Sequence, residues 1–387
     1  MSPLHIVAGI FAVLAFGGLG YQLLSIYAAV RFLKHPIVQT NFTPPISILK
    51  PLKGFDPEMY ESFRSHCLQY YPGNYEIIFG VNDASDEAIS AVERLRREFP
   101  DRNVSLLVCS DLLGTNRKVS NLVQMSALAK YGHIIINDSD IRVPPDYLQR
   151  VAAPFADPNV GMVTALYRAV THDFWSTIEA VTISTDFAGG VLSAIVVEGG
   201  LHFALGSTLA ISRTALDKIG GFQPLCDHLA DDYELGNRTT AAGYHVELSD
   251  VVVETFLPAY SFSGMFQHQL RWARTIRDKR KGGYLGVLFT FGLVWAILAA
   301  LLSVGAWWSL ATLALVALAR ITNAYILCTR VLHDRISLRN LWLIPLRDAI
   351  GLLVWLGSYA GNTVHWRGED FTLRDGKLSR THPPSTR

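Results

Sequence analysis

Apolar residues are concentrated in two long blocks that flank a middle part of different periodicity. The first block, Leu4 to Val30, is nearly uncharged and longer than the ~20 residues that a helix needs to cross a bilayer. It lacks a basic start and is too long for a typical signal peptide, so it predicts a retained membrane anchor. Arg31 and Lys34 follow directly, and the bias of basic residues toward the inner side of a membrane places the next part of the chain in the cytoplasm.

The second block begins at Tyr284 and predicts further spans. Tyr284 to Leu302 and Ala306 to Leu327 are two apolar runs joined by a very short turn. Arg320 is the only formal charge inside them. An arginine at such a depth usually faces a partner or an aqueous cavity.

A third apolar run, residues 341–366, carries Arg347 and Asp348, two charges that can pair or reach the membrane surface. This run either crosses the membrane or re-enters it, so the side on which the chain ends stays open. Residues 367–387 form a polar, proline-containing tail that we expect to be loosely ordered.

Between the two blocks the pattern is that of a soluble α/β domain, in which short β-branched runs alternate with amphipathic helices. The predicted strands are Ser47 to Lys50, Tyr75 to Val81, Val104 to Cys109 and His133 to Ile136. The predicted helices are Pro57 to Gln69, Asp86 to Phe99 and Arg117 to Lys130. This alternation predicts a mostly parallel, Rossmann-like sheet with right-handed crossovers.

Beyond the fourth strand the pattern is less regular. We expect strands at Val160 to Thr164, Phe203 to Ser212 and Tyr244 to Phe256, and a helix from Asp232 to Ala241. The apolar stretch from Thr177 to Val196 contains Asp186 and a pair of glycines. We therefore interpret that stretch as a surface that meets the membrane or an apolar ligand rather than as a span.

Residues 261–283 combine basic and apolar positions in a helical pattern. Arg271, Arg274 and Arg277 recur every third residue among aromatic and aliphatic side chains. This pattern predicts a basic amphipathic helix that lies along the cytoplasmic surface of the bilayer, although a simple basic anchor for the next span explains the charges as well.

Composition narrows the class of protein. Half of the 387 residues are hydrophobic, which agrees with membrane segments. The net charge of +1 and the lack of a basic stripe with interleaved aromatic residues outside the helix just described argue against nucleic-acid binding. The four cysteines are far apart and form no CxxC pair, so neither a disulfide framework nor a zinc site is indicated.

The strongest candidate chemistry lies where the fourth strand ends, at Asp138 and Asp140. Open α/β sheets place ligands at the carboxyl ends of their strands. In extended backbone, residues two apart point to the same side, so both carboxylates can bind one Mg²⁺ or Mn²⁺ that is shared with a diphosphate. The alternative is that these acids cap the helix that starts near Pro144.

Three further motifs strengthen the metal interpretation. Asp83 follows the second strand and can accept a hydrogen bond from a nucleobase or ribose, unless this turn only caps a helix. Lys118 lies in a loop, residues 114–121, that can bind phosphate or a sugar hydroxyl. Asp231 and Asp232 are adjacent carboxylates, which raise one another's pKa and favour a general base, with helix capping as the alternative.

The order of these motifs along the chain resembles that of the GT-A glycosyltransferases of family two and of family twenty-one, the ceramide glucosyltransferases. The motifs are, in order, Asp83, Asp138-x-Asp140, Asp232 and the sequence from His268 to Trp272. The resemblance covers roughly residues 46–281 and the flanking spans. The segments 48–54, 114–121 and 138–143 are especially similar to ceramide glucosyltransferases and to related bacterial enzymes associated with hopanoid synthesis.

The resemblance implies a role for each matching residue. Asp232 becomes the general base, and Asp138 and Asp140 become the metal ligands. The implied nucleotide-sugar-binding residues are Lys50, Pro51, Asp83, Lys118, Asn121, Asp138, His268, Arg271 and Trp272. Two positions depart from the family pattern: His268 replaces the usual Gln or Arg, which leaves its role open between His268 and Gln267, and Asp231 replaces a frequent Glu.

The predicted function is that of an inverting glycosyltransferase that moves one sugar from a UDP-sugar, such as UDP-glucose or UDP-N-acetylglucosamine, to a hydroxyl of a membrane lipid. The acceptor is a hopanoid polyol or ceramide, and the bacterial relatives imply a multi-pass protein of the bacterial inner membrane. One alternative is a processive polysaccharide synthase, although the predicted spans are few for a polymer channel. A second is a metal-dependent nucleotidyl or phosphoryl transferase, although the sequence lacks a P-loop. A third is a non-catalytic scaffold.

The donor sugar, the acceptor and the oligomeric state stay open. The expected organisation is an N-terminal anchor (1–34), a cytoplasmic GT-A catalytic domain (35–260), a basic interfacial helix (261–283), a C-terminal transmembrane region (284–366) and a polar tail (367–387).

Overall fold

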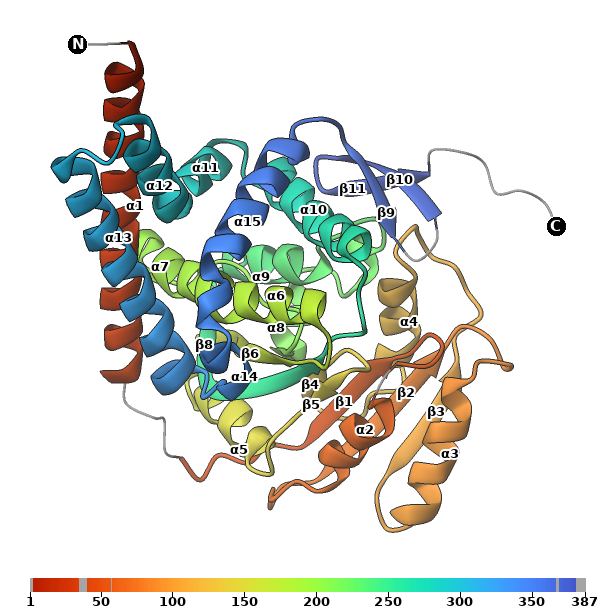
Figure 1. Ribbon diagram of the computed structural model, residues 1–387. Coiled ribbons are helices and arrows are strands. Elements are labelled where there is room, and N and C mark those ends of the chain that lie inside the picture. Colours follow the sequence, from red (N-terminus) through yellow and green to blue (C-terminus); the bar gives the residue numbers. More distant parts are fainter. Residues whose placement is uncertain (1–2, 35–39, 57, 367–368, 381–387) are drawn as a thin grey trace. The chain divides into compact units, whose positions relative to one another are not determined.

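The computed structural model of the protein describes residues 3–34, 40–56, 58–366 and 369–380 (Figure 1). These residues form two compact units whose chain segments interleave. The sheet unit comprises residues 36–170, 198–258 and 376–387. The helical unit comprises residues 1–35, 171–197 and 259–375.

The described part of the sheet unit contains an eight-stranded sheet with the strand order β3-β2-β1-β4-β7-β6-β8-β5. Its first four strands are parallel neighbours: β3 (Val104–Val108), β2 (Tyr75–Val81), β1 (Ile46–Pro51) and β4 (His133–Ile136). The sequence predicted all four within one or two residues at each end.

The other half of the sheet is mixed. Strand β7 (Leu209–Ser212) runs antiparallel to both β4 and β6 (Val160–Val170), whereas β6 is parallel to β8 (His245–Phe256) and β5 (Ile141–Arg142) is antiparallel to β8. The prediction of a mostly parallel sheet is confirmed, but the strand expected at residues 203–212 is wrong for its first half. A turn closed by the hydrogen bond from Thr208 N to Leu205 O (3.1 Å) interrupts it.

Helices cover both faces of the parallel half. On β2, Ile77, Phe79 and Val81 point into a core that includes buried residues of α2 (Met59–Cys67), α3 (Ala88–Glu98) and α5 (Tyr147–Ala152). Gly80 lies on the opposite face, where an added Cβ would meet Met125 Sδ of α4 (Arg117–Ser126) at 2.4 Å. The alternation of side chains along one buried strand therefore separates the helices into two layers.

The helical unit is built from apolar helices and one short antiparallel strand pair. Its elements are α1 (Pro3–Lys34), α6 (Phe174–Thr182), α7 (Ala188–Glu198), α10 (Phe262–Lys279), α11 (Lys281–Leu285), α12 (Gly292–Leu302), α13 (Trp307–Ile326), α14 (Arg335–Arg339), α15 (Ile344–Ser358), β9 (Thr363–Trp366) and β10 (Glu369–Arg374).

Among the described residues, five helical stretches are long and apolar enough to cross a membrane: Pro3–Lys34, Phe174–Glu198, Lys281–Leu302, Trp307–Val331 and Leu341–Ser358. The second of these is the stretch that we predicted not to be a span. Its helices α6 and α7 are continuous through a π-helical turn, Ile183–Phe187, so the paired glycines do not break it as the sequence suggested.

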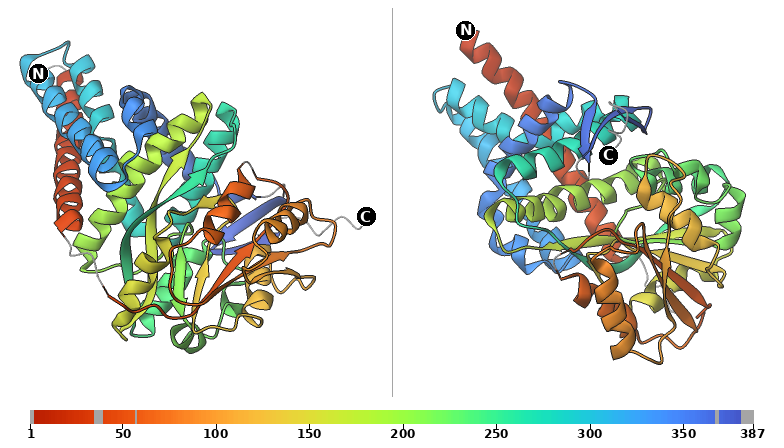
Figure 2. Two further views of the ribbon diagram at one scale, coloured as in Figure 1. Left: turned by 90° about the horizontal axis from the view of Figure 1, so that it is seen from below. Right: turned by 90° about the vertical axis from the view of Figure 1, so that its right-hand side faces the viewer.

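Small residues bring α1 close to its neighbours. Figure 2 shows α1, in red, beside α12 and α13 within the helical unit. The buried face of α1 carries small side chains at intervals of three or four residues, among them Ala8, Ala12, Ala15 and Gly18. A Cβ on Gly18 would lie 2.4 Å from the Cα of Gly292, so the two backbones touch, as in small-xxx-small helix pairs.

Charged side chains inside the helical unit are paired. Arg320 and Asp348 are almost fully buried and lie 3.0 Å apart (Nη2 to Oδ1). Arg347 also binds Asp348 (2.9 Å) and, through its other terminal nitrogen, Asp186 of the π-helical turn. The expectation that Arg320 faces a partner is confirmed, and Asp348 holds both guanidinium groups.

The expectation of a loosely ordered tail is wrong for the described residues 369–380, which contain β10 and β11 (Lys377–Arg380). The two strands are separated by Asp375 and Gly376, and both of these residues have positive φ values (51° and 78°). An Asp-Gly pair between alternating apolar residues such as Phe371 and Leu378 is a hairpin signal, and it overrides the polar composition.

Candidate active site

The acidic turn after β4 is held by two lysines of the sheet unit. Lys118 Nζ lies 2.9 Å from Asp138 Oδ1, and Lys50 Nζ donates to the backbone oxygen of Asp138 (2.9 Å). Asp140 accepts a short hydrogen bond from Thr255 Oγ1 on β8. Neither acid caps a helix, since α5 begins after Asp146 without a side-chain cap, so the capping alternative is wrong here.

The argument that placed both carboxylates on one side of an extended strand is also wrong, because Ile141 N donates to Asp138 O (3.3 Å) and closes a turn. The two acids nevertheless affect each other electrostatically. Burial raises the pKa of Asp140 from its usual value near 3.8 to about 6, and the charge of Asp138 adds to this shift. The turn therefore concentrates negative charge.

Lys118 joins this turn to the second acidic pair. Its ammonium group lies 3.3 Å from Asp231 Oδ2 as well as 2.9 Å from Asp138. Burial alone would lower the pKa of Lys118, but the carboxylates outweigh burial and raise it. Asn116 starts α4 and accepts from Val119 N (3.2 Å), which fixes the helix turn that carries Lys118.

Asp232 faces the same space from helix α9 (Asp231–Ala241). A Cβ on Gly206 would lie 3.1 Å from Asp232 Oδ2 and 3.9 Å from Asp138 Oδ2, so both carboxylates lie within 4 Å of one point. Asp232 Oδ1 accepts from Tyr233 N (2.7 Å), and its side chain does not cap the helix, which begins after Ala230. Oδ2 is therefore the oxygen directed at this point.

The environment of Asp232 prepares it to accept a proton. Burial and, to a smaller extent, the neighbouring Asp231 raise its pKa to about 6 against the opposing effect of Lys118. Burial also lowers the pKa of Lys50 to about 7 against the attraction of Asp140 and Asp138. A carboxylate with a pKa near neutrality is suited to general base catalysis.

Within the described residues, no group of three or more His, Cys, Asp or Glu side chains forms an all-protein metal cage. Asp138 and Asp140 alone supply two carboxylates. Mg²⁺ is commonly held by one or two carboxylates together with substrate phosphates and water. The donor set thus fits a hard divalent cation that arrives with a diphosphate, because two carboxylates are the share of ligands that the protein itself commonly supplies to such a cation.

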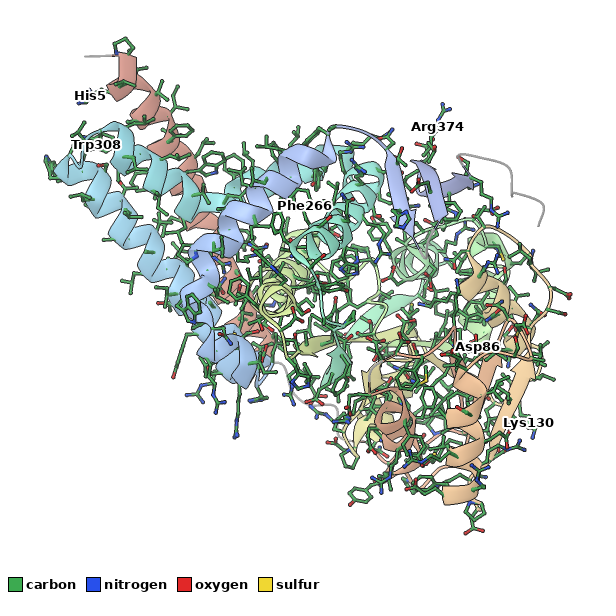
Figure 3. All side chains as sticks on the ribbon, turned by 45° about the vertical axis from the view of Figure 1, so that its right-hand side comes forward. His5, Asp86, Lys130, Phe266, Trp308 and Arg374 are labelled. Atoms are coloured by element: carbon green, nitrogen blue, oxygen red, sulfur yellow. The ribbon has the colours of Figure 1, made fainter. Side chains whose placement is uncertain are left out.

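Two of the predicted nucleotide-binding residues of the sheet unit, Asp83 after β2 and Asn121 on α4, have defined partners. Asp83 is exposed, and its Oδ1 accepts from Ser85 N and Oγ (both 2.8 Å), which lowers its pKa. Asp86, labelled in Figure 3, accepts from the backbone N of Ala88, the first residue of α3 (2.9 Å). Asn121 is buried and accepts from Asn82 Nδ2 (2.6 Å).

Sequence reasoning missed a buried polar cluster behind the acidic turn. Asn137 is fully buried, and its amide donates to Ser207 O (2.7 Å) and Tyr147 Oη (2.9 Å). His66 Nε2 contacts the Asn137 oxygen (3.2 Å). The cluster ties the turn of Asp138 to the turn of Gly206. An amide at the end of an apolar strand was the available signal, but two of its partners, His66 and Ser207, lie about 70 residues away.

The motif from His268 to Trp272 lies on α10 of the helical unit. His268 Nδ1 is 2.7 Å from Glu179 Oε1 of α6, and its ring packs against those of Tyr260 and Trp272. Trp272 also packs against Phe187. The buried Glu179 is a partner that the sequence did not indicate. Binding of the diphosphate by Arg271 and Trp272 stays a prediction.

The other arginines of α10 bind protein rather than project freely. Arg277 donates to Gly361 O (3.0 Å) and to Ser358 O, and Arg274 donates to Thr363 O. These bonds hold the segment that follows α15. The predicted basic amphipathic helix therefore exists over Phe262–Lys279, with part of its charge committed to its own unit.

Comparison with known proteins gives a family and a fold. The family model described as glycosyl transferase family 21 matches residues 10–379. Ceramide glucosyltransferase 1 of Caenorhabditis elegans is 25% identical over 230 residues, which cover 59% of this chain and 49% of that protein. Beta-monoglucosyldiacylglycerol synthase of Synechocystis is 24% identical over 196 residues, which cover 50% of this chain and 39% of that protein. The chain spans about half the length of the ceramide glucosyltransferases of C. elegans that it matches.

Among solved structures, a mannosyltransferase from Pyrobaculum calidifontis, determined with GDP-Man and Mn²⁺, superposes with a TM-score of 0.53 and 21% identity. The match covers 92% of this chain and 99% of that one. It confirms the predicted glycosyltransferase fold.

Proposed function

Because the chain belongs to glycosyl transferase family 21, we propose that it transfers a single sugar from a UDP-sugar to a hydroxyl group of a membrane lipid, with inversion at the anomeric carbon. The observation that carries this proposal is the convergence of Asp138 and Asp232 on one point next to Gly206. Such a point, bordered by a base on one side and a diphosphate-binding turn on the other, is where an acceptor hydroxyl and a sugar donor can meet.

Asp232 is the general base in this mechanism. Its Oδ2 takes the proton of the acceptor hydroxyl as that oxygen bonds to the anomeric carbon, and the electron pair of the broken C–O bond leaves with UDP. Oδ1 stays bound to Tyr233 N, which orients the carboxylate. Attack from the side opposite the leaving group gives inversion.

Asp138 and Asp140 would hold a Mg²⁺ or Mn²⁺ ion, which supplies charge neutralisation for the departing diphosphate. Lys118 links the two acidic pairs and keeps Asp138 and Asp231 in place. We assign Lys50, Pro51, Asp83 and Asn121 to the nucleotide end of the donor. His268 or Gln267, with Arg271 and Trp272, completes the proposed diphosphate contacts by family resemblance.

A lipid acceptor is supported by the relatives and by the apolar helices. The matched proteins are named for transfer of glucose to ceramide and for synthesis of a glucosyldiacylglycerol. Five described helices qualify as membrane spans. We propose a multi-pass protein of a bacterial inner membrane, with the sheet unit in the cytoplasm and a ceramide or a hopanoid polyol as acceptor. The small number of spans disfavours a polymer channel.

The test is release of UDP by the purified full chain with Mg²⁺ or Mn²⁺, across a panel of UDP-sugars, with ceramide, a polyhydroxylated hopanoid or diacylglycerol in detergent. GDP-mannose belongs in the panel, because the similar mannosyltransferase was solved with it. Release that requires metal, one sugar and one lipid, with a product of the summed mass, supports the proposal. No release with any pair contradicts it.

Asp232→Asn tests the base within the same assay. General base catalysis contributes about 10²- to 10⁴-fold, so kcat falls by that factor while donor binding is retained. Asp217→Asn, an exposed site on α8 (Arg213–Lys218), is the matched control and keeps full activity. A fully active Asp232→Asn variant would refute the role of the base.

A further inference from the structure

The C-terminal strand β11 of the sheet unit docks onto the segment that leads into the acidic helix α9. We call residues 226–230 the acid loop, because Asp231 and Asp232 follow it directly. Leu378 N donates to Asp227 O (2.8 Å), and Leu229 N donates to Gly376 O (3.1 Å). His228 and Lys377 form an antiparallel bridge between these two bonds. The acid loop thus gains a short strand partner from the far end of the chain.

The other side of the acid loop is held by the turn before α4. Asn116 N donates to Cys226 O (2.7 Å), and Asn116 Nδ2 donates to His228 O (2.8 Å). Asp227 Oδ1 accepts from both the backbone and the hydroxyl of Thr115 (2.9 and 3.1 Å). The contact is so close that a Cβ on Gly114 would lie 2.5 Å from Cys226 O.

The acid loop is therefore held between the turn before α4 and strand β11, and both contacts are connected to residues of the candidate active site. On one side, α4 begins after Asn116 and carries Lys118, which pairs with Asp231 and Asp138. On the other side, β11 contributes backbone hydrogen bonds to the acid loop. Asp232 lies three residues beyond Leu229, so a displacement of the Leu229 peptide moves the start of α9.

We infer that β11 is a positioning element of the active site, whose backbone hydrogen bonds to the acid loop set the place of Asp232 relative to Asp138. This inference rests on the proposed role of Asp232 as the base. It assigns a part in the reaction to a strand that carries none of the reacting groups. β11 is not one of the eight strands of the large sheet, so the pairing of those strands does not include it.

Leu378→Pro in the full chain tests the inference, because proline lacks the N–H that donates to Asp227 O. Leu378→Ala is the matched control, since it removes the buried side chain but keeps the N–H. A misplacement of ~1 Å costs about 10²-fold in rate, so a shift of half that size lowers kcat about tenfold in Leu378→Pro. The donor KM stays unchanged, and Leu378→Ala stays within about threefold of the native kcat.

Hydrogen exchange separates positioning from general instability. In Leu378→Pro the amide of Leu229 exchanges faster, while amides of β2 and β4 keep their protection. If Leu378→Pro does not fold, a chain that ends at Asp375 replaces it, compared with a chain that ends at Arg380. If the amide of Leu229 exchanges faster in the variant and kcat is nevertheless native, the inference is overturned. Equal losses of kcat in Leu378→Pro and Leu378→Ala overturn it as well.

The two proposals fail in different ways. If Asp232→Asn is active, the assignment of the base is wrong, whatever β11 does. If Asp232→Asn is inactive and Leu378→Pro has native kcat, only the role of β11 is wrong.

Discussion

Replacing Gly206 by alanine adds one methyl group at the point on which the carboxylates of Asp138 and Asp232 converge. The new Cβ would lie 3.1 Å from Asp232 Oδ2, 3.8 Å from Asp232 Cγ and 3.9 Å from Asp138 Oδ2. The φ angle of Gly206 lies outside the left-handed region, so alanine fits the backbone without strain. Any effect of the substitution therefore comes from the contact with Asp232.

The size of the effect follows from this distance. An ordinary van der Waals contact of a Cβ begins near 3.4 Å, so the Asp232 carboxylate or the turn must give way by roughly 0.3 Å. Since a misplacement of ~1 Å costs about 10²-fold in rate, a shift of that size costs about fourfold. The methyl group also takes up space beside both carboxylates, where the acceptor hydroxyl is proposed to lie. We therefore expect kcat to fall about four- to tenfold with little change in donor KM.

The assay is steady-state UDP release with the donor and lipid that the panel described above selects. Gly200→Ala is the matched control, because its Cβ would meet nothing closer than His202 Cε1 at 4.0 Å. Thermal unfolding in detergent should be the same for both variants within a degree or two. If Gly206→Ala has the kcat of Gly200→Ala, the Gly206 turn does not border the reacting groups, and the site as described is wrong.

Four further predictions follow from the same contacts. The kcat should rise with pH through about 6, because only the ionised Asp232 accepts a proton and its pKa is raised to that value; a flat pH–rate profile between pH 5 and 7 would contradict this. Lys118→Met leaves Asp138 and Asp231 without their shared counter-charge and should cost about 3 kcal/mol of stability, read from denaturant unfolding; a loss below 1 kcal/mol would show that water already screens the pair. Asp348→Asn removes the carboxylate that pairs with the buried Arg320 and leaves Arg347 with Asp186 alone; it should lower the melting temperature strongly, whereas the exposed Arg330→Gln should not. Removal of divalent metal with a chelator should abolish UDP release, and Mn²⁺ or Mg²⁺ should restore it; activity that survives chelation would argue against a metal.

The parallel half of the sheet was predictable because each of its strands is a short β-branched run followed by a polar turn. Ile134 to Ile136 is such a run, and the pairing of β4 beside β1 follows from the rules for parallel crossovers. The candidate acids were also predictable as residue types, since Asp138 and Asp232 follow or begin regular elements.

The geometry of the site was not predictable in the same way. The turn closed by Ile141 N and Asp138 O depends on strand β5, which pairs with β8 more than a hundred residues later. The contact of Gly206 with Asp232 and the burial of Asn137 depend likewise on distant partners. Local periodicity carries no information about such contacts, so it identifies the acids but not the point on which they converge.

The close approach of Gly18 to Gly292 has a consequence for how the protein is made. Helix α1 is synthesised before α12, and residues 36–170 and 198–258 of the sheet unit lie between the two helices in the sequence. During that interval the face of α1 that is buried in the folded protein lacks its partners from α12 and α13. One of these partners is Asn323, whose amide donates a hydrogen bond to Gln22 of α1 in the folded protein. An apolar helix taken from another protein would insert into a membrane equally well, but it would lack this face. Helix α1 is therefore a late-assembling part of the fold, and a generic apolar helix would not make its contacts with Gly292 and Asn323.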